Sequence, residues 1–461
     1  MATIQCITPV DSSVYVERET ATEPQIQQTL SASVAAQKLW KKTPIAERKA
    51  LCSKAVDTFV SRKAEIAEEL SWQMGRPISQ AAGEAGGFEE RARYMISIAD
   101  TALADVNPGD KEGFTRYIKR EALGVVFVIA PWNFPYMTAV NAIMPALLAG
   151  NTVILKHSAQ TPMCAERLHQ AFTDAGLPEG VFQYLHLTHA DTEKVIQAPE
   201  VNFIAFTGSV PGGEMVERAS VGRFVGVGLE LGGKDPAYVR KDANLQYAID
   251  TVTDGAMFNS GQSCCGIERV YVDEAIFEEF VAGVVALCNG YQLGRSDDAA
   301  TNLGPMVKTS AADFVRGQID DAVAAGAKAL IDPAKFPADK KGTPYLAPQV
   351  LINVDHSMRV MTEESFGPVI GIMSVSSDDE AIKLMNDSEF GLTAAVFTQD
   401  ENAAIEIGDQ IETGTWYMNR CDYLDPALAW TGVKNSGRGC TLSSVGFEHM
   451  TRPKSYHLKR I

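Results

Sequence analysis

The sequence predicts an α/β fold with two doubly wound parallel sheets, and three observations carry this prediction. The chain has 461 residues, too many for one hydrophobic core, so more than one domain is expected. From Gly124 onward, short apolar runs alternate with amphipathic stretches, as in parallel sheets covered by helices on both faces. A second series of the same kind begins after Gly233, so the two sheets are expected to meet near Leu231–Lys234.

The first hundred residues are expected to be helical. Residues 46–61 and 62–74 place apolar side chains at three- and four-residue spacing among charged ones. Five apolar runs then predict the strands of the first sheet, at residues 124–131, 151–156, 180–185, 201–206 and 224–231. Helices are expected between these strands, at residues 163–175 and 192–198.

The second series follows the same rule. Its strands are expected at residues 269–272, 369–373 and 393–397. Its helices are expected at residues 245–259, 274–287, 311–325 and 379–386.

Two further segments, residues 114–121 and 455–459, alternate charged and bulky side chains like exposed strands. Because exposed strands are liabilities unless they are paired, an oligomerisation arm is expected. A simple surface hairpin is an equally supported alternative.

Composition excludes several classes of function. The 41 Lys and Arg residues against 58 Asp and Glu residues give a net charge of −17, which disfavours nucleic acids and anionic membranes as partners. The first twenty residues have neither a basic start nor an apolar core, and no apolar run reaches the roughly 18 residues of a membrane span. A cytoplasmic protein is therefore expected.

Cysteine usage agrees with a reducing compartment. Eight cysteines are scattered without a CxxC pair, so neither a metal site nor a disulfide framework is expected. The seven histidines are dispersed and form no HExxH pair, which argues against a metal hydrolase.

Cys264 stands in the segment NSGQSCCG, residues 259–266. Small polar residues fill a core poorly but let the backbone approach a substrate, and a nucleophilic thiol needs such access with a lowered pKa. Two adjacent cysteines cannot both face one pocket, so one of Cys264 and Cys265 is expected to pack inside. For any single cysteine, a core-filling role is the alternative.

Glu230 lies in the apolar stretch GVGLELGGK, residues 226–234. A buried carboxylate must be paired or have a raised pKa. One interpretation is a general base with a tuned pKa. The other is a structural ion pair with Lys234.

Two loops follow predicted strands. In APWNFP, residues 130–135, two prolines present Asn133 at a carboxyl strand end, where ligands bind in open α/β sheets. The Asn133 amide could donate to an oxyanion, and an ordinary turn is the alternative. In FTGSVPGG, residues 206–213, glycines and a serine ahead of a helix suit a phosphate group.

Together these residues resemble the aldehyde dehydrogenase superfamily over essentially the whole chain. The motifs occur in the family's order: APWNFP, ALLAGNTVILK, FTGS, LELGGK, GQSC, EESFGPV and GVKNSGRG. The resemblance implies an NAD(P)-dependent enzyme that oxidises an aldehyde to a carboxylic acid through a cysteine thiohemiacetal and thioester. Within it, residues 1–103 and 123–231 would form a Rossmann-like cofactor-binding domain, 232–434 a catalytic domain, and 104–122 with 448–461 an oligomerisation arm of a homodimer or homotetramer.

The resemblance also implies catalytic roles. Cys264 would be the nucleophile, and Asn133 with the backbone N–H of Cys264 would hold the oxyanion. Glu230 would activate the water that hydrolyses the thioester. Lys234 would be a structural or relay partner of that base.

The cofactor implied is NAD or NADP. Lys156 would bind the adenosine ribose, Ser209 the pyrophosphate and Glu364 the nicotinamide ribose; further contacts would come from Trp132, Ser158, Ala159, Gly208 and Phe366. The family often reads KPSE where this chain has KHSA at residues 156–159. Because Ala159 replaces a carboxylate that would repel a 2′-phosphate, NADP is expected to be tolerated or weakly preferred.

By the same resemblance, the substrate entrance would be lined by Phe134, Asn141, Phe258, Cys265, Arg420, Tyr423 and Trp430. Aromatic side chains with few fixed charges favour an apolar or aromatic aldehyde. Arg420 points to the alternative of a semialdehyde, such as succinate semialdehyde, whose carboxylate a guanidinium could hold. A salt bridge from Arg420 to Asp422 or to a helix carboxylate is its structural alternative.

Two rival functions remain. A coenzyme-A-acylating aldehyde dehydrogenase would release the thioester with a thiol, and Glu230 argues against it because acylating relatives commonly lack that base. A non-catalytic relative would be expected to lose its nucleophile, whereas Cys264, Asn133, Glu230 and Glu364 are all present.

Overall fold

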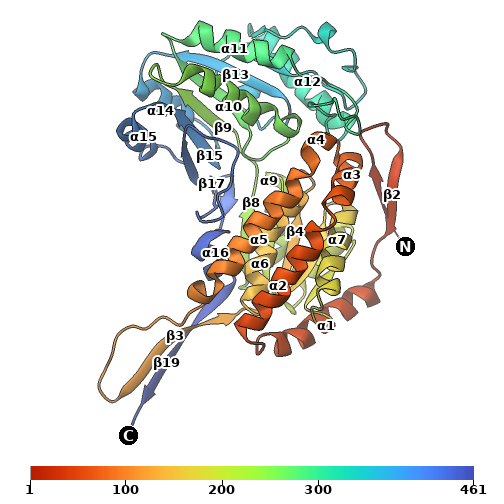
Figure 1. Cartoon of the computed structure of the whole chain (residues 1–461), viewed down its shortest axis with the longest axis vertical. Helices are drawn as coiled ribbons and strands as arrows, with labels where there is room; N and C mark the ends of the chain where they lie inside the picture. The colour runs from red at the N-terminus through yellow and green to blue at the C-terminus, as the bar shows by residue number, and fades with distance from the viewer. Residues whose placement is uncertain (1) are drawn as a thin grey trace.

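A computed structural model describes residues 2–461 and arranges them as two sheet-containing units with a long two-stranded arm (Figure 1). The α/β fold class predicted from the sequence is confirmed. Residues 231–234 link the last parallel strand of the first sheet to a central strand of the second. No helix among residues 2–461 is long and apolar enough to cross a membrane.

The first sheet has six strands. Five are parallel, and a short sixth strand, β18, pairs antiparallel with β8. Their order is β18 (Gly437–Arg438), β8 (Gly226–Glu230), β7 (Val201–Thr207), β4 (Val125–Ala130), β5 (Thr152–His157) and β6 (Phe182–Tyr184).

Both faces of this sheet are buried, as the continuous apolar strands predicted. Side chains alternate along β4, so Val126 and Val128 pack into one core while Phe127 and Ile129 pack into another. Helices of the first core are α2 (Ile45–Val60), α3 (Lys63–Met74), α4 (Ile78–Ala81), α5 (Gly83–Ala102), α6 (Pro135–Leu148), α7 (Pro162–Asp174) and α16 (Ser443–His449). The second core is covered by α1 (Glu23–Trp40), α8 (His189–Gln197) and α9 (Val210–Ser220).

The second sheet has seven strands, of which only β11 is antiparallel to its neighbour. Their order is β11 (Lys328–Ala329), β12 (Gln349–Ile352), β13 (Val369–Val375), β10 (Ile267–Asp273), β9 (Asp235–Val239), β15 (Thr393–Phe397) and β16 (Thr415–Met418). Its helices are α10 (Leu245–Met257), α11 (Phe277–Asn289), α12 (Thr309–Ala324), α13 (Arg359–Thr362), α14 (Asp378–Asn386) and α15 (Glu401–Gly408).

The two segments with alternating charge pair with each other. Strand β3 (Phe114–Ala122) runs antiparallel to β19 (Thr451–Lys459), and the pair extends away from both units (Figure 1). The stacked rings of Tyr117 and Tyr456, with centroids 4.5 Å apart, hold the register.

The expectation of an all-helical first hundred residues is wrong at the N-terminus. Strands β1 (Thr3–Ile7) and β2 (Val14–Glu19) form an antiparallel hairpin beside the helices. The segments TIQCI and VYVERE are rich in β-branched and aromatic residues, which favour a strand over a helix.

Candidate functional site

The candidate active site lies at the carboxyl end of the first sheet. Strands β4, β5, β7 and β8 are parallel neighbours, so the residues that follow them meet at one edge of the sheet. These residues include Asn133 after β4, Ser209 after β7 and Glu230 at the end of β8. Cys264 reaches the same edge from the loop that joins α10 to β10.

A tight left-handed turn carries Cys264 to this edge. Asn259, Ser260 and Gly261 have φ angles of 53°, 57° and 70°, a conformation that costs a non-glycine residue about 1–2 kcal/mol. The Ser260 hydroxyl donates to the Gly304 carbonyl at 2.8 Å, and the Asn259 amide donates to the Gln262 carbonyl at 3.1 Å. These contacts hold the strained turn in place and fix the position of the backbone that carries Cys264.

A buried arginine clamps the Asn133 loop. Arg76 pairs with Glu84, donates to the backbone carbonyl of Asn133, and lies 4.4 Å from the centroid of the Phe134 ring. The side-chain amide of Asn133 donates to the Gln262 carbonyl at 3.2 Å. Because Gln262 belongs to the Cys264 loop, this hydrogen bond fixes Asn133 relative to the thiol.

Cys264 is half-buried and lies where two cavities meet. The first cavity is lined by Pro131, Trp132, Asn133, Thr207, Gly208, Ser209, Leu231, Gly232, Cys264, Glu364 and Phe366. The second cavity is lined by Glu90, Arg91, Phe134, Met137, Thr138, Asn141, Thr207, Glu230, Leu231, Ser263, Cys264, Cys265, Leu392, Asp422, Tyr423, Leu424 and Trp430. One thiol can therefore meet two different molecules, one in each cavity.

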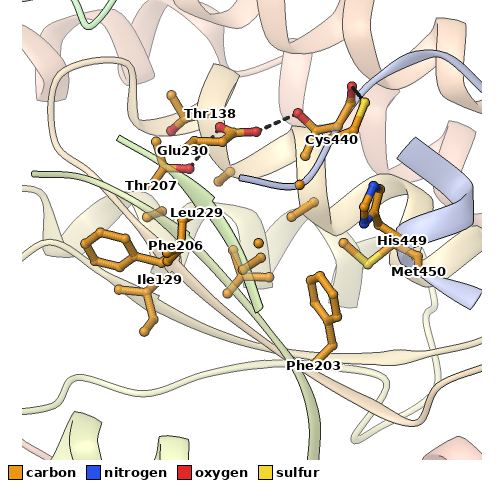
Figure 2. Close-up of a pocket in the computed structure, with 18 of the residues that line it drawn as sticks. Ile129, Thr138, Phe203, Phe206, Thr207, Leu229, Glu230, Cys440, His449 and Met450 are labelled. Carbon is orange, nitrogen blue, oxygen red and sulfur yellow. Dashed lines mark hydrogen bonds between the residues drawn. The ribbon is translucent and has the colours of Figure 1, made fainter. Parts of the chain in front are cut away.

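Glu230 lies on the wall of the second cavity between two threonines. Thr207 donates to Oε2 at 3.0 Å and Thr441 to Oε1 at 2.5 Å (Figure 2). Burial raises the pKa of Glu230, while the two hydroxyls and the charge of Arg91 lower it. Glu230 therefore lies on the cavity wall with the partners of a candidate general base.

A third cavity lies on the other side of Glu230. Figure 2 shows Glu230 and Thr207 at one end and His449 and Met450 at the other, with Cys440 and Phe203 between. Glu230, Thr207 and Thr138 line both this cavity and the second one.

The contacts of Lys234 contradict the alternative of an ion pair with Glu230. Its ammonium group lies 2.5 Å from Oε2 of Glu268 and 3.0 Å from the Ser365 hydroxyl, so it is no ion-pair partner of Glu230. Both charged side chains of this pair are almost fully buried, and neither lines any of the three cavities. The contacts of Lys234 are structural, and they give no support to the catalytic role expected for it.

The first cavity contains a carboxyl group with one free oxygen. Oε1 of Glu364 accepts from the backbone N–H of Gly233 at 3.0 Å. Burial, with the nearby charge of Glu268, raises the pKa of Glu364 to about 8. A Cβ at Gly232 would collide with this carboxyl group, so a larger residue there would displace the Glu364 side chain.

Other predicted residues of this region divide into two groups. Trp132 and Phe366 meet edge to face, with ring centroids 5.6 Å apart, and Gly208 and Ser209 lie beside them in the first cavity. Ser209 is also the N-cap of α9, accepting from Gly212 N–H at 3.4 Å. Lys156 lies in β5, and Ser158 and Ala159 follow this strand; none of the three lines this cavity.

In the second cavity, Cys265 lies beside a buried carboxylate. Oδ1 of Asp422 accepts from the Ser263 hydroxyl at 2.8 Å and from the Cys265 thiol at 3.1 Å. Burial raises the pKa of Asp422 to about 6. Hydrogen bonding with Cys264 and burial raise the pKa of Cys265 well above its usual range, so of the two adjacent cysteines Cys265 is the packing one.

Of the predicted entrance residues, Phe134, Asn141, Cys265, Tyr423 and Trp430 line the second cavity, but two others do not. Phe258 stacks behind Phe134, with ring centroids 6.4 Å apart. Arg420 is exposed and lies over the outer face of Tyr423, 3.6 Å from the ring centroid. Its expected salt bridge to Asp422 is also wrong, because Asp422 faces Ser263 and Cys265.

Several residues of the site were not predicted from the sequence. Arg91 and Glu90 come from α5, Asp422 from the loop after β16, and Thr441 from the segment between β18 and α16. Among these residues, only the position of Arg91 could be recognised from the sequence. It lies at helical spacing from Glu84, Phe88 and Met95, which are buried on the same face of α5. Among residues 2–461, no cluster of three or more His, Cys, Asp or Glu side chains could hold a metal ion.

Comparisons with known proteins agree with this geometry. The model of the aldehyde dehydrogenase family matches residues 1–456. A succinate-semialdehyde dehydrogenase [NADP(+)] of Mycobacterium avium is 35% identical over 416 residues, covering 90% of this chain and 87% of that protein. A vanillin dehydrogenase of Pseudomonas fluorescens is 37% identical over 408 residues, covering 85% and 83%.

Solved structures are similar along the whole chain. The NADP-dependent glyceraldehyde-3-phosphate dehydrogenase from Bacillus halodurans, solved in complex with NADP, superposes with a TM-score of 0.93 and 31% sequence identity. The match covers 100% of this chain and 96% of that one.

Proposed function

This chain belongs to the aldehyde dehydrogenase family, and on that premise we propose that Cys264 carries the oxidation of an aldehyde to a carboxylic acid through a thioester that Glu230 helps to hydrolyse. The observation that carries the proposal is the position of Cys264 at the junction of the first and second cavities, with Glu230 on the wall of the second. An aldehyde in the second cavity and a nicotinamide in the first would then meet at one sulfur atom.

In the first half-reaction, the Cys264 thiolate adds to the aldehyde carbon, and the carbonyl oxygen becomes an oxyanion. The Asn133 amide has two hydrogens, one of which is already directed at the Gln262 carbonyl. Its second hydrogen and the backbone N–H of Cys264 are proposed to bind the oxyanion. The nicotinamide cofactor supplies the oxidising chemistry, since it accepts the hydride that leaves the carbon.

In the second half-reaction, Glu230 accepts a proton from water as the water oxygen attacks the thioester carbon. The C–S bond breaks, the acid leaves, and Cys264 regains its thiolate. Glu230 must be ionised for this step, and the hydroxyls of Thr207 and Thr441 favour the ionised form.

The residues of the first cavity fit a nicotinamide dinucleotide. The free oxygen of the Glu364 carboxyl group is a partner for a ribose hydroxyl, and Ser209 at the start of α9 is a partner for a phosphate. Trp132, Gly208 and Phe366 complete this cavity. We propose that Lys156, Ser158 and Ala159 contact the adenosine end beyond it.

The enzyme uses NAD or NADP, in agreement with the NADP-dependent relatives. Ala159 is exposed and carries no charge, so a 2′-phosphate would meet no carboxylate at this position. The lack of a carboxylate at this position supports use of NADP.

We propose that residues 1–103 and 123–231 bind the cofactor, that 232–434 form the catalytic domain, and that 104–122 with 448–461 form an oligomerisation arm. The projection of β3 and β19 away from both units supports a homodimer or homotetramer. We also propose a cytoplasmic location, which the eight free cysteines support.

The test is formation of reduced cofactor by the purified protein with aliphatic, aromatic and ω-carboxylate aldehydes. Each aldehyde is offered with NAD and with NADP, in the presence and absence of coenzyme A. Turnover without coenzyme A is expected and supports hydrolysis. Turnover only with coenzyme A would assign the acylating reaction instead, and no turnover under any condition would contradict the proposed function.

A further inference from the structure

Arg91 is a buried cation without a counter-ion. Arg91 is 4% exposed, and it lines the second cavity. Among residues 2–461, no carboxylate lies within ion-pairing distance of its guanidinium group. An arginine cannot lose its proton in a protein, so the full charge stays in the cavity wall.

Among the described residues, the buried Arg48 donates to two backbone carbonyls and lines none of the three cavities. Three other buried cations are neutralised or fully hydrogen-bonded. Arg76 pairs with Glu84, and Lys234 pairs with Glu268. Arg269 has no carboxylate, but each of its three nitrogens donates to at least one backbone carbonyl. Arg91 differs from all three in facing a cavity with part of its donor set unused.

The polar groups around Arg91 are neutral. Nη1 donates to the Met137 carbonyl at 2.6 Å and, more weakly, to Oδ1 of Asn141 at 3.4 Å. Neither Nε nor Nη2 has an acceptor within the described part of the chain. The amide nitrogen of Asn141, a residue 1% exposed, is also without a partner, so donors of two side chains are free on one wall.

The carboxylates of the same cavity already have donors. Glu230 accepts from Thr207 and Thr441, and Asp422 accepts from Ser263 and Cys265. Glu90, at the same cavity, accepts from the Tyr423 hydroxyl at 2.7 Å. Each carboxylate of this cavity thus has at least one donor, whereas donors of its one cation have no acceptor.

We propose that Arg91, assisted by the amide of Asn141, binds the carboxylate of a semialdehyde whose aldehyde carbon is directed at Cys264. The inference rests on the proposed function and names its substrate class. A guanidinium group presents parallel N–H donors that match a carboxylate, and the substrate charge would neutralise a cation that the fold leaves unpaired. Specificity for a carboxylate thus arises from α5 and α6, and not from Arg420.

The test compares succinate semialdehyde with butanal, which has the same chain length but no carboxylate. The unmodified enzyme is expected to have the higher kcat/KM with succinate semialdehyde. In Arg91→Met, the ratio of the two kcat/KM values should fall about 100-fold, because a desolvated charge pair loses one partner. Arg91→Lys should lower the ratio less than Arg91→Met does, because lysine keeps the charge but cannot form the bidentate contact with a carboxylate.

Arg93→Met is the matched control. Arg93 lies on the same helix, but its side chain is 40% exposed and pairs with Asp57 and Glu89 outside the cavity. Its substitution should leave the ratio unchanged. A ratio near one in the unmodified enzyme, or an unchanged ratio in Arg91→Met, would overturn the inference while leaving aldehyde oxidation intact.

A binding measurement separates this inference from the proposed function. Succinate, which cannot be oxidised, is titrated calorimetrically into the unmodified protein and into Arg91→Met. Binding to the first and about 100-fold weaker binding to the second supports the carboxylate site even if no aldehyde is turned over. Absence of succinate binding to the unmodified protein would count against Arg91 as an anchor.

Discussion

The hydroxyl of Thr441 donates a 2.5 Å hydrogen bond to Oε1 of Glu230, so a residue that follows the antiparallel edge strand β18 helps set the charge state of a carboxyl group on β8. Burial alone would hold the pKa of Glu230 above its usual range. Thr441, then Thr207, then the charge of Arg91 counteract this effect. Groups from three separate segments therefore favour the ionised form.

Replacing Thr441 with valine should shift the pH profile of thioester hydrolysis. Loss of the hydroxyl raises the pKa of Glu230, and a general base works only when it is deprotonated, so the acidic limb of kcat should move to higher pH. The measurement is kcat against pH, with Thr441→Ser as the control that keeps the hydroxyl. An acidic limb at the same pH in both variants would show that Thr441 does not tune the base.

Replacing Glu230 with glutamine should separate the two half-reactions. Glutamine cannot accept the proton from water, so a burst of reduced cofactor should be followed by turnover about 10²- to 10⁴-fold slower than normal. Rapid-mixing measurement of reduced cofactor gives both phases. Unchanged steady-state turnover would remove Glu230 as the base.

Replacing Cys264 with serine should abolish oxidation while cofactor binding remains. Cys264 is half-buried between two cavities, whereas Cys265 is buried with a raised pKa and donates to Asp422. Cys265→Ser, which keeps a donor for Asp422, should therefore impair turnover far less than Cys264→Ser. The reverse order would identify Cys265 as the nucleophile.

A carboxylate at position 159 should favour NAD. Ala159→Glu would place a negative charge where a 2′-phosphate is expected, and repulsion should raise the NAD-to-NADP ratio of kcat/KM about tenfold. Ala159→Gln has nearly the same size without the charge, and it should leave the ratio close to its original value. Equal ratios in both variants would show that this loop does not contact the 2′ position.

Breaking the pair of Lys234 and Glu268 should destabilise the fold. Lys234→Met leaves Glu268 buried without its counter-ion and should cost about 3–5 kcal/mol, read from urea unfolding. Lys234→Met combined with Glu268→Leu should recover most of this loss because no unpaired charge remains. A loss of turnover with unchanged stability in the single variant would instead support a relay role for Lys234.

Strands and loops whose structure depends on residues close in the sequence were predictable. The apolar runs of the first sheet became β4, β5, β6, β7 and β8, because continuous burial leaves little choice of conformation. The loops after β4 and β7 were recognisable from their prolines and glycines, and the structure brings Asn133, Ser209 and Cys264 to one cavity.

Contacts between distant segments were not predictable in the same way. Lys234 is close to Glu230 in sequence, but the strand turns its side chain toward Glu268. Arg420 was identified as the guanidinium of the entrance, yet Arg91 occupies the wall because α5 packs against α6. Thr441 reaches Glu230 only through the pairing of β18 with β8.

The pairing of β18 with β8 and of β19 with β3 has a consequence for synthesis of the chain. Every strand of the second sheet lies between residues 235 and 418, so that sheet can close as soon as this stretch has left the ribosome. The first sheet begins earlier but lacks its edge strand β18, the β19 partner of β3, and the Thr441 hydroxyl until residues 437–459 emerge. The half of the protein that is translated first is therefore the half that is finished last, and its strand edges stay unpaired for the longer time.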